Sequence, residues 1–318
     1  PIKETDNLII LAFSNSNISQ EFIKALNPTL AFNINNFNIL PFKKALKREH
    51  IINLVEKIIR ICKTDWDSFE YSWNFKHIPL LSKKNRMKTI NQSFQNWLNS
   101  CDLNIKETQQ LEIENNRLFI EEYGLRNELT PDVPENQITL ERGDQVDDMK
   151  RLISYSVGCI LGRYSLDEQG LIYAHSGNEG FDVSKYKTFP ADDDGIITLS
   201  DLEELMVRDD VATRFTEFLT VAWSKDTLSE NLKFIADTLG AKTNELPKET
   251  IRRWISTDLF KDHLQRYKNR PIYWLFSSGK KKAFEALVYL HRYNESTLSR
   301  MRMKYVVPLQ TLISDQLK

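Results

Sequence analysis

Apolar residues recur at the three-to-four-residue spacing of amphipathic helices through most of the first half of the chain. This spacing predicts helices at Ile18–Leu26, Glu49–Lys63, Ile90–Leu98 and Asn104–Tyr123. The first is expected to end at Asn27, because the residue before Pro28 is pushed out of the helical region of backbone space. Further on, Phe32, Ile34 and Phe37 alternate with asparagines, which predicts a short strand and loop.

The second half of the chain predicts more helices after a loop-rich stretch. Residues 167–199 are rich in glycine and contain two short strand-like runs, Leu171–Tyr173 and Ile196–Leu199. A capping box of Thr227 and Glu230 is expected to open one helix, which Gly240 closes. The helices are expected at Met149–Tyr164, Val211–Trp223, Thr227–Gly240, Pro247–Ile255, Leu259–Tyr267, Lys281–Tyr293 and Thr297–Leu317.

A long helix is predicted near the middle of the chain, where Leu111 and Leu118 are seven residues apart, as are Ile113 and Ile120. Gly124 stands where a left-handed residue would end that helix. The predicted fold is therefore mainly α, formally α+β with a few short strands, and its helical subdomains are joined by a long spacer helix.

Two prolines mark the best domain boundary, at residues 130–135. We expect residues 1–101 to be the end of one region, residues 102–130 to be the spacer helix, and residues 131–318 to be a C-terminal helical domain.

Charged residues are distributed unevenly along the chain, although its formal net charge is only -1. Residues 1–101 contain 14 Lys and Arg against 8 Asp and Glu, residues 102–250 contain 15 against 31, and residues 251–318 contain 14 against 5. Basic blocks of this density suit a polyanionic partner, because lysine and arginine release counterions from phosphates. Alternatively, the opposite charges simply face each other in the folded protein.

Composition and cysteine usage exclude several protein classes. Hydrophobic residues make up 41% of the chain, which is too many for intrinsic disorder. The three cysteines, Cys62, Cys101 and Cys159, form no disulfide framework or zinc motif and are predicted to be reduced core residues. The apolar run at residues 8–13 is too short for a signal peptide or a membrane span, so we expect a cytoplasmic protein without membrane contact.

The catalytic and cofactor motifs that we sought are incomplete. Residues 277–281 imitate the end of a phosphate-binding loop but lack its first glycine and its hydroxyl. Asp192–Asp194 lack the alternating ligands of a calcium loop, and the five histidines show no metal-ligand spacing. Asn27-Pro28-Thr29-Leu30 lacks the second proline and the aromatic residue of an adenine-methylating tetrapeptide. We predict no catalytic, cofactor-binding or metal-binding residue within this chain.

One constellation does indicate a binding function, near the C-terminus. Basic and aromatic residues interleave there, as phosphate contacts and base stacking require. The nucleic-acid-binding candidates are Lys268, Arg270, Lys280, Lys281, Lys282, Arg292 and Arg302. The aromatics are Tyr267, Tyr273, Trp274, Phe276, Tyr289 and Tyr293. Their spacing is equally compatible with a buried core in which only the charges are exposed.

Several long strings of residues resemble the C-terminal part of the PglX family, the adenine-specific DNA methyltransferases of BREX phage-defence systems. The strings cover residues 26–30 (LNPTL), 65–70 (DWDSFE), 123–131 (YGLRNELTP), 153–167 (ISYSVGCILGRYSLD), 260–263 (FKDH), 270–280 (RPIYWLFSSGK) and 286–294 (ALVYLHRYN). The resemblance extends over nearly the whole chain.

The resemblance implies a fragment of an S-adenosylmethionine-dependent, site-specific N6-adenine DNA methyltransferase. The family's catalytic and cofactor segments lie upstream of the residues that match, so no catalytic residue can be transferred. The resemblance implies that residues 1–101 are the end of the methyltransferase and target-recognition region. We expect the chain to serve in DNA recognition and scaffolding and to bind double-stranded DNA. The alternative is a protein-interaction module that docks other BREX proteins or phage inhibitors through the acidic middle of the chain.

Overall fold

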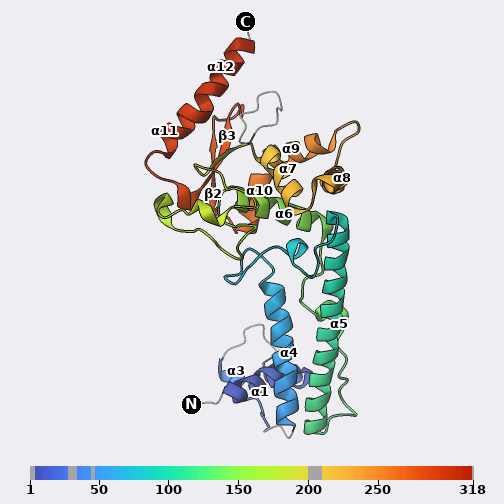
Figure 1. Cartoon of the computed structure of the whole chain (residues 1–318). Coiled ribbons are helices and arrows are strands. Elements are labelled where there is room, and N and C mark those ends of the chain that lie inside the picture. Colours follow the sequence, from blue (N-terminus) through green and yellow to red (C-terminus); the bar gives the residue numbers. More distant parts are fainter. Residues whose placement is uncertain (1–3, 28–33, 44–46, 200–209, 317–318) are drawn as a thin grey trace. The chain divides into compact units, whose positions relative to one another are not determined.

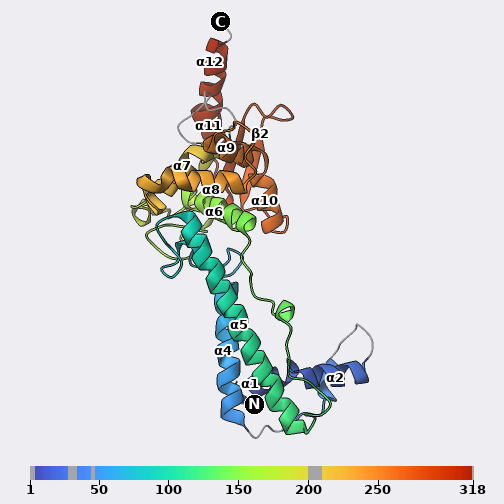
Figure 2. The same cartoon turned by 90° about the vertical axis from the view of Figure 1, so that its right-hand side faces the viewer.

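The computed structural model describes residues 4–27, 34–43, 47–199 and 210–316. These residues form two compact units, which we describe separately. Unit 1 contains residues 1–66 and 99–142, and unit 2 contains residues 67–98 and 143–318. The predicted fold class is confirmed, because helices dominate both units and the described strands form one small sheet (Figures 1 and 2). No helix in the described ranges is long and apolar enough to cross a membrane.

The regular secondary structure of unit 1 is all helical in its described residues. Its helices are α1 (Glu4–Ser14), α2 (Asn17–Leu26), α3 (Ile34–Asn38), α4 (Arg48–Trp66) and the greater part of α5 (Ile90–Tyr123). The predicted helices at residues 18–26 and 49–63 are thereby confirmed. The predicted strand around Ile34 and Phe37 is wrong, because both residues lie in α3; Phe32 is outside the described residues.

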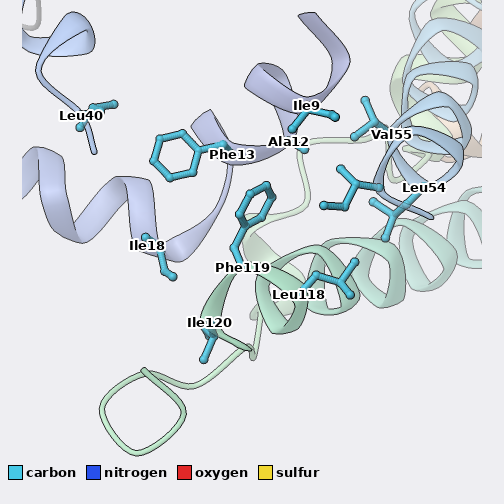
Figure 3. Packing of buried hydrophobic residues seen from close by; sticks show 11 residues of the cluster. Ile9, Ala12, Phe13, Ile18, Leu40, Leu54, Val55, Leu118, Phe119 and Ile120 are labelled. Atoms are coloured by element: carbon cyan, nitrogen blue, oxygen red, sulfur yellow. The ribbon is translucent and has the colours of Figure 1, made fainter. Parts of the chain in front are cut away.

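The core of unit 1 lies where α1, α4 and α5 meet (Figure 3). Phe13 of α1 packs edge-on against Phe119 of α5, with ring centroids 5.7 Å apart. The buried members of this core are Ile9, Ala12, Phe13, Ile18, Leu40, Ile51, Leu54, Val55, Leu118, Phe119 and Ile120. Burying these side chains supplies the main driving force for folding of the unit.

Helix α5 is continuous where the sequence predicted two helices. The residues between the predicted segments include no glycine or proline, and Cys101 is buried there. Packing therefore stabilises the helix across residues 99–103, where the sequence has little apolar periodicity. At its end, Gly124 has a φ of 73°, and the N–H of Leu125 donates to the carbonyl of Ile120. This is the predicted glycine-terminated cap.

The proline-containing segment after α5 packs back along that helix within unit 1. The Asn116 side chain donates to the carbonyl of Pro131, and the Gln109 side chain donates to the carbonyl of Val133. Val133, with Ile138 and Leu140, is buried in a second cluster that includes Ile105 of α5. The three domain ranges expected from the sequence stay a prediction.

Unit 2 combines helices with the described sheet. Its helices are the start of α5, α6 (Gln145–Ile160), α7 (Val211–Ala222), α8 (Leu228–Thr238), α9 (Pro247–Thr257), α10 (Leu259–Arg266), α11 (Thr297–Met301) and α12 (Val307–Gln316). A π-helical turn, Arg302–Val306, joins the last two. Gly240 ends α8 with a φ of 83°, as predicted, but Thr227 makes no capping hydrogen bond from its side chain.

The sheet of unit 2 is antiparallel and has the strand order β1-β3-β2. Its strands are β1 (Ile196–Thr198), β2 (Tyr273–Ser277) and β3 (Glu285–Tyr289). The helix predicted at residues 281–293 is wrong, because this segment holds β3 and a short 3-10 turn. All five residues of β3 are buried, since it is the central strand. A short apolar run buried on every side has the same pattern in a strand and in a helix.

Two further predictions need correction. Leu171–Tyr173 is irregular in the structure and is not a strand, whereas the predicted strand at residues 196–199 is confirmed by β1. Cys62 is an exposed thiol, while Cys101 and Cys159 are buried as expected. Cys62 lies on the solvent side of α4, where a cysteine is compatible with the helical pattern but contributes nothing to the core.

Ion pairs link the acidic middle of the sequence to its basic ends within each unit. In unit 1, Lys47 of the basic N-terminal block approaches Glu121 of the acidic middle to 3.6 Å. In unit 2, Arg252 of α9 pairs with Asp210 at 3.0 Å, and both side chains are almost fully buried. Opposite charges facing each other in the fold therefore account for part of the uneven charge distribution.

The cap at Gly124 gives a test of the fold of unit 1. Replacing Gly124 by alanine should lower the free energy of unfolding by about 1 kcal/mol, because a residue with a Cβ resists a positive φ. No atom lies within 4 Å of the added Cβ, so the cost comes from the backbone alone. Asparagine at this position should cost less, since it tolerates the left-handed conformation. Urea denaturation of both variants measures this, and equal losses would contradict it.

Candidate nucleic-acid interface

The turn between α10 and β2 presents the first two candidates, Lys268 and Arg270. Both are exposed, and neither forms an ion pair with a described residue. Lys268 and Asn269 have φ values of 50° and 59°, and the N–H of Asn269 donates to the carbonyl of Leu264. This turn therefore ends α10 and holds its basic side chains in solvent.

Buried His263 fixes the beginning of β2 beside this turn. Its Nε2 accepts hydrogen bonds from the backbone N–H groups of Ile272 and Tyr273, at 3.1 and 3.2 Å. Burial, with the nearby Arg163 and Arg266, lowers the pKa of His263 to about 4. The ring is thus neutral at physiological pH and can act as an acceptor. Through these two hydrogen bonds the ring positions the first residues of β2.

The loop joining β2 to β3 presents three more candidates, Lys280, Lys281 and Lys282. All three are exposed. Lys282 is partly neutralised by Glu285, at 3.1 Å, whereas Lys280 and Lys281 form no ion pair with a described residue. The five-residue strand β2 separates this loop from Lys268 and Arg270 by roughly 17 Å. The predicted residues therefore lie at two ends of one strand rather than at a single point.

Arg302 is the last exposed candidate. It lies at the start of the π-helical turn, where the neighbouring Met301 and Tyr305 pack on the sheet. Lys304, on the same turn, is different, because it pairs with Asp193 at 2.8 Å and with Asp194 at 3.0 Å. Arg302 is available to a ligand, while Lys304 is held by the protein.

Arg292 has to be removed from the candidate interface, because the structure buries it completely. Its guanidinium donates to the carbonyls of Asp192 and Asp193, at 2.6 and 2.8 Å, and to the Asn178 side chain at 2.8 Å. It also stacks on the Phe181 ring, 3.8 Å from the centroid. A guanidinium that satisfies buried carbonyls serves the core and cannot reach a phosphate.

The aromatic residues of this region are largely part of the core. Tyr273 and Tyr289 are buried, and Tyr267 hydrogen-bonds inward. Trp274 is 38% exposed and lies 5.7 Å from the ring of Tyr293, which is half-buried. The alternative in which the aromatics pack inside and only the charges reach solvent therefore describes most of this region.

The acidic run Asp192–Asp194 serves as a structural cap. The Asp192 carboxylate accepts from the backbone N–H groups of Asp194, Gly195 and Ile196. Asp194 accepts from the hydroxyl of buried Tyr305 and from Lys304. These bonds engage the carboxylates of Asp192 and Asp194 within the protein.

The described residues do not fit the cofactor that the family resemblance implies. Nucleotide-like cofactors bind at the carboxyl ends of parallel strands, next to a glycine-rich turn that opens a helix. The described sheet is antiparallel, and Gly177 lies in a short 3-10 turn whose Asn178 holds Arg292. Asn27 is described, but the rest of the Asn-Pro-Thr-Leu string falls outside the described residues.

A second basic segment, residues 71–88, was not singled out from the sequence. No acidic residue occurs between Glu70 and Asp102, and five cations lie in this segment, all of them exposed: Lys76, Lys83, Lys84, Arg86 and Lys88. None of the five forms an ion pair with a described residue. Counting charged residues over the whole of residues 1–101 obscured this segment, because acidic residues occur earlier in that block. A count over a shorter window would have shown it.

A buried carboxyl ties the start of this basic segment to the turn after α10. The hydroxyl of Tyr267 donates to Glu70 Oε2 at 2.7 Å, and the other carboxyl oxygen is enclosed. Burial raises the pKa of Glu70, although the hydrogen bond from Tyr267 and nearby Arg266 oppose the rise. Tyr71 directly follows Glu70 in the chain, and Lys268 directly follows Tyr267. Basic segments 197 positions apart are thus anchored to one point in unit 2.

Replacing Arg292 tests its structural role. Arg292→Ala should lower the free energy of unfolding by about 3 kcal/mol or more, because it leaves the Asp192 and Asp193 carbonyls buried without donors. Lys281→Ala, which changes an exposed side chain, should cost less than about 0.5 kcal/mol. Thermal unfolding of both variants measures the difference. A small effect of Arg292→Ala would return this residue to the candidate interface.

Asp192 predicts a pH dependence of stability. Burial and neighbouring Asp194 raise its pKa from 3.8 to about 7, so between these pH values the folded protein holds a proton that the unfolded chain has released. Stability should therefore fall as the pH rises through this window, by at most about 1.4 kcal/mol per pH unit. Asp192→Asn should abolish that part of the fall and be more stable than the unmodified protein at pH 8. Denaturation at pH 5 and pH 8 tests this, and parallel pH profiles would contradict it.

Two curated proteins that are named adenine-specific methyltransferases are similar to this chain over nearly all of its length. It is 43% identical over 310 residues to PglX of Lacticaseibacillus casei (strain Zhang), covering 96% of this chain and 25% of that protein. It is 43% identical over 324 residues to BrxX of Escherichia coli O9:H4 (strain HS), covering 94% of this chain and 26% of that protein. No family model matches the chain.

The chain spans about a quarter of the length of the curated relatives that it matches. The match nonetheless covers nearly all of its own residues, and so includes both units and the basic surfaces described above. Over that length, the chain is homologous to a portion of the PglX and BrxX proteins.

Proposed function

We propose that this chain is the DNA-contacting part of a longer, S-adenosylmethionine-dependent N6-adenine DNA methyltransferase that acts in phage defence. One observation carries the proposal: the basic side chains Lys268, Arg270, Lys280, Lys281 and Arg302 are exposed, and none forms an ion pair with a described residue. Other cations of unit 2, such as Arg252 and Lys304, are held by carboxylates. Exposed cations without intramolecular partners suit the phosphates of a duplex.

In this proposal, the chain positions the DNA and the rest of the protein performs the chemistry. Lysine and arginine contacts to phosphate fix the orientation of a duplex without reading its sequence. Methyl transfer to adenine requires a base turned out of the helix into a separate pocket. Such a protein works in the cytoplasm beside the chromosome, and S-adenosylmethionine supplies its methyl group.

The salt dependence of DNA binding tests this proposal. In the intact protein, the logarithm of the affinity for duplex DNA should fall linearly with the logarithm of the salt concentration. The double variant Lys280→Ala/Lys281→Ala should weaken binding to all duplex sequences similarly and reduce the slope by about 2. Fluorescence anisotropy at about 50 to 200 mM salt measures the affinity and the slope. Phosphate contacts weaken strongly over this range of salt concentration.

A matched control is Lys242→Ala/Lys248→Ala, which removes two exposed lysines elsewhere in unit 2. These residues lie near the start of α9, outside the candidate interface, so affinity and slope should both be unchanged. The proposal fails if the intact protein does not bind duplex DNA at low salt. It also fails if the two double variants have the same slope.

A further inference from the structure

Trp73 is the most exposed large apolar side chain among the described residues of the protein. Its relative exposure is 101%, while Phe69 and Phe75 on either side are 4% and 5% exposed. An indole left in water contributes none of the burial free energy that a core aromatic side chain supplies. An aromatic ring that stays fully exposed between two core residues is available to a ligand.

The backbone that carries Trp73 is held in a hydrogen-bonded turn. The N–H of Ser72 donates to the carbonyl of Phe69, and the N–H of Phe75 donates to the carbonyl of Ser72. The Ser72 hydroxyl donates to Asp67 at 2.5 Å and accepts from the N–H of Asn74 at 3.1 Å. Because the turn uses its own polar groups, Trp73 projects from an ordered support.

Three side chains fasten this turn to the body of unit 2. Phe69 lies under the guanidinium of Arg151, 4.3 Å from the ring centroid. Phe75 packs edge-on against Tyr164, with centroids 5.2 Å apart. Glu70 accepts the hydrogen bond from Tyr267 described above. The exposed indole is thus pre-positioned, which reduces the entropy lost when it binds a partner.

The exposed cations that follow Trp73 are also held on a fixed support. Pro79 and Leu80 are buried, and the side chain of Asn85 donates to the carbonyl of Pro79 at 3.2 Å. The N–H of Arg86 donates to the carbonyl of Ser82 at 2.9 Å. Lys83, Lys84 and Arg86 therefore project from a compact turn and do not lie on an unstructured tail.

We propose that residues 71–88 bind DNA, with Trp73 stacking on a base that has left the duplex stack and the cations of the segment contacting the adjacent phosphates. An exposed aromatic ring in a segment that also carries free cations is a combination suited to unstacked nucleotides, because every base offers a π face and the backbone offers phosphates. This inference rests on the proposed function, since an adenine methyltransferase creates an unstacked base when it turns out its target. A protein partner fits less well, because the segment presents five cations and no carboxylate.

The test compares two duplexes in the intact protein: one fully paired, and one with a single adenine opposite an abasic site. The unmodified protein should bind the second duplex about tenfold more tightly, as one stacked base would provide. Trp73→Ala should remove this preference, Trp73→Phe should keep part of it, and the control Leu246→Ala, at an exposed apolar residue, should leave it unchanged. The double variant Lys83→Ala/Lys84→Ala should weaken binding to both duplexes and leave their ratio intact.

A direct optical readout complements the affinities. The exposed indole should lose fluorescence when a base stacks on it, so addition of the abasic duplex should quench the unmodified protein more than Trp73→Phe. If Trp73→Ala keeps the full preference and the same quenching, Trp73 does not stack and the inference is overturned. If the intact protein binds neither duplex, the proposed function itself fails, and the two failures are thereby distinguished.

Discussion

The completely buried guanidinium of Arg292 is the interaction on which the rest of unit 2 depends. It stands just beyond the central strand β3 and donates to the carbonyls of Asp192 and Asp193 and to the Asn178 side chain. A long irregular segment between α6 and β1 cannot satisfy its own polar groups, so the core needs a multivalent donor. Arginine is suited to this role because it offers five N–H groups and remains charged.

The consequences of this guanidinium extend to the neighbouring elements. A Cβ at Gly195 would lie 2.9 Å from Cβ of Arg292, so only glycine allows β1 to approach so closely. The carboxylate of Asp192 caps the same bend, and Asp194 binds the hydroxyl of Tyr305. The sheet, the loop and the C-terminal helices are thereby joined through polar bonds in a core that is otherwise largely apolar.

Buried polar anchors also determine which charges remain for a ligand. Arg292 and Lys304 are engaged by the protein, whereas Lys280, Lys281 and the cations of residues 71–88 are not. The Glu70–Tyr267 hydrogen bond brings the segment containing Trp73 and the turn containing Lys268 to one anchor. The proposed DNA-contacting surface therefore consists of the cations that the core does not pair. Its exposed aromatic residue, Trp73, comes from a segment that is distant in sequence from Lys268.

The sequence by itself determined the helices with clear apolar stripes, the glycine ends at Gly124 and Gly240, and the family resemblance, because these depend on local spacing or on long strings of residues. It could not assign β3, because a short apolar run looks alike in a central strand and in a buried helix. Nor could it separate buried Arg292 from exposed Arg302, since residue type and spacing are the same for a cation that binds carbonyls and one that faces water. Only the tertiary structure decided these points, because burial and hydrogen-bond partners depend on segments that meet across more than a hundred residues of chain.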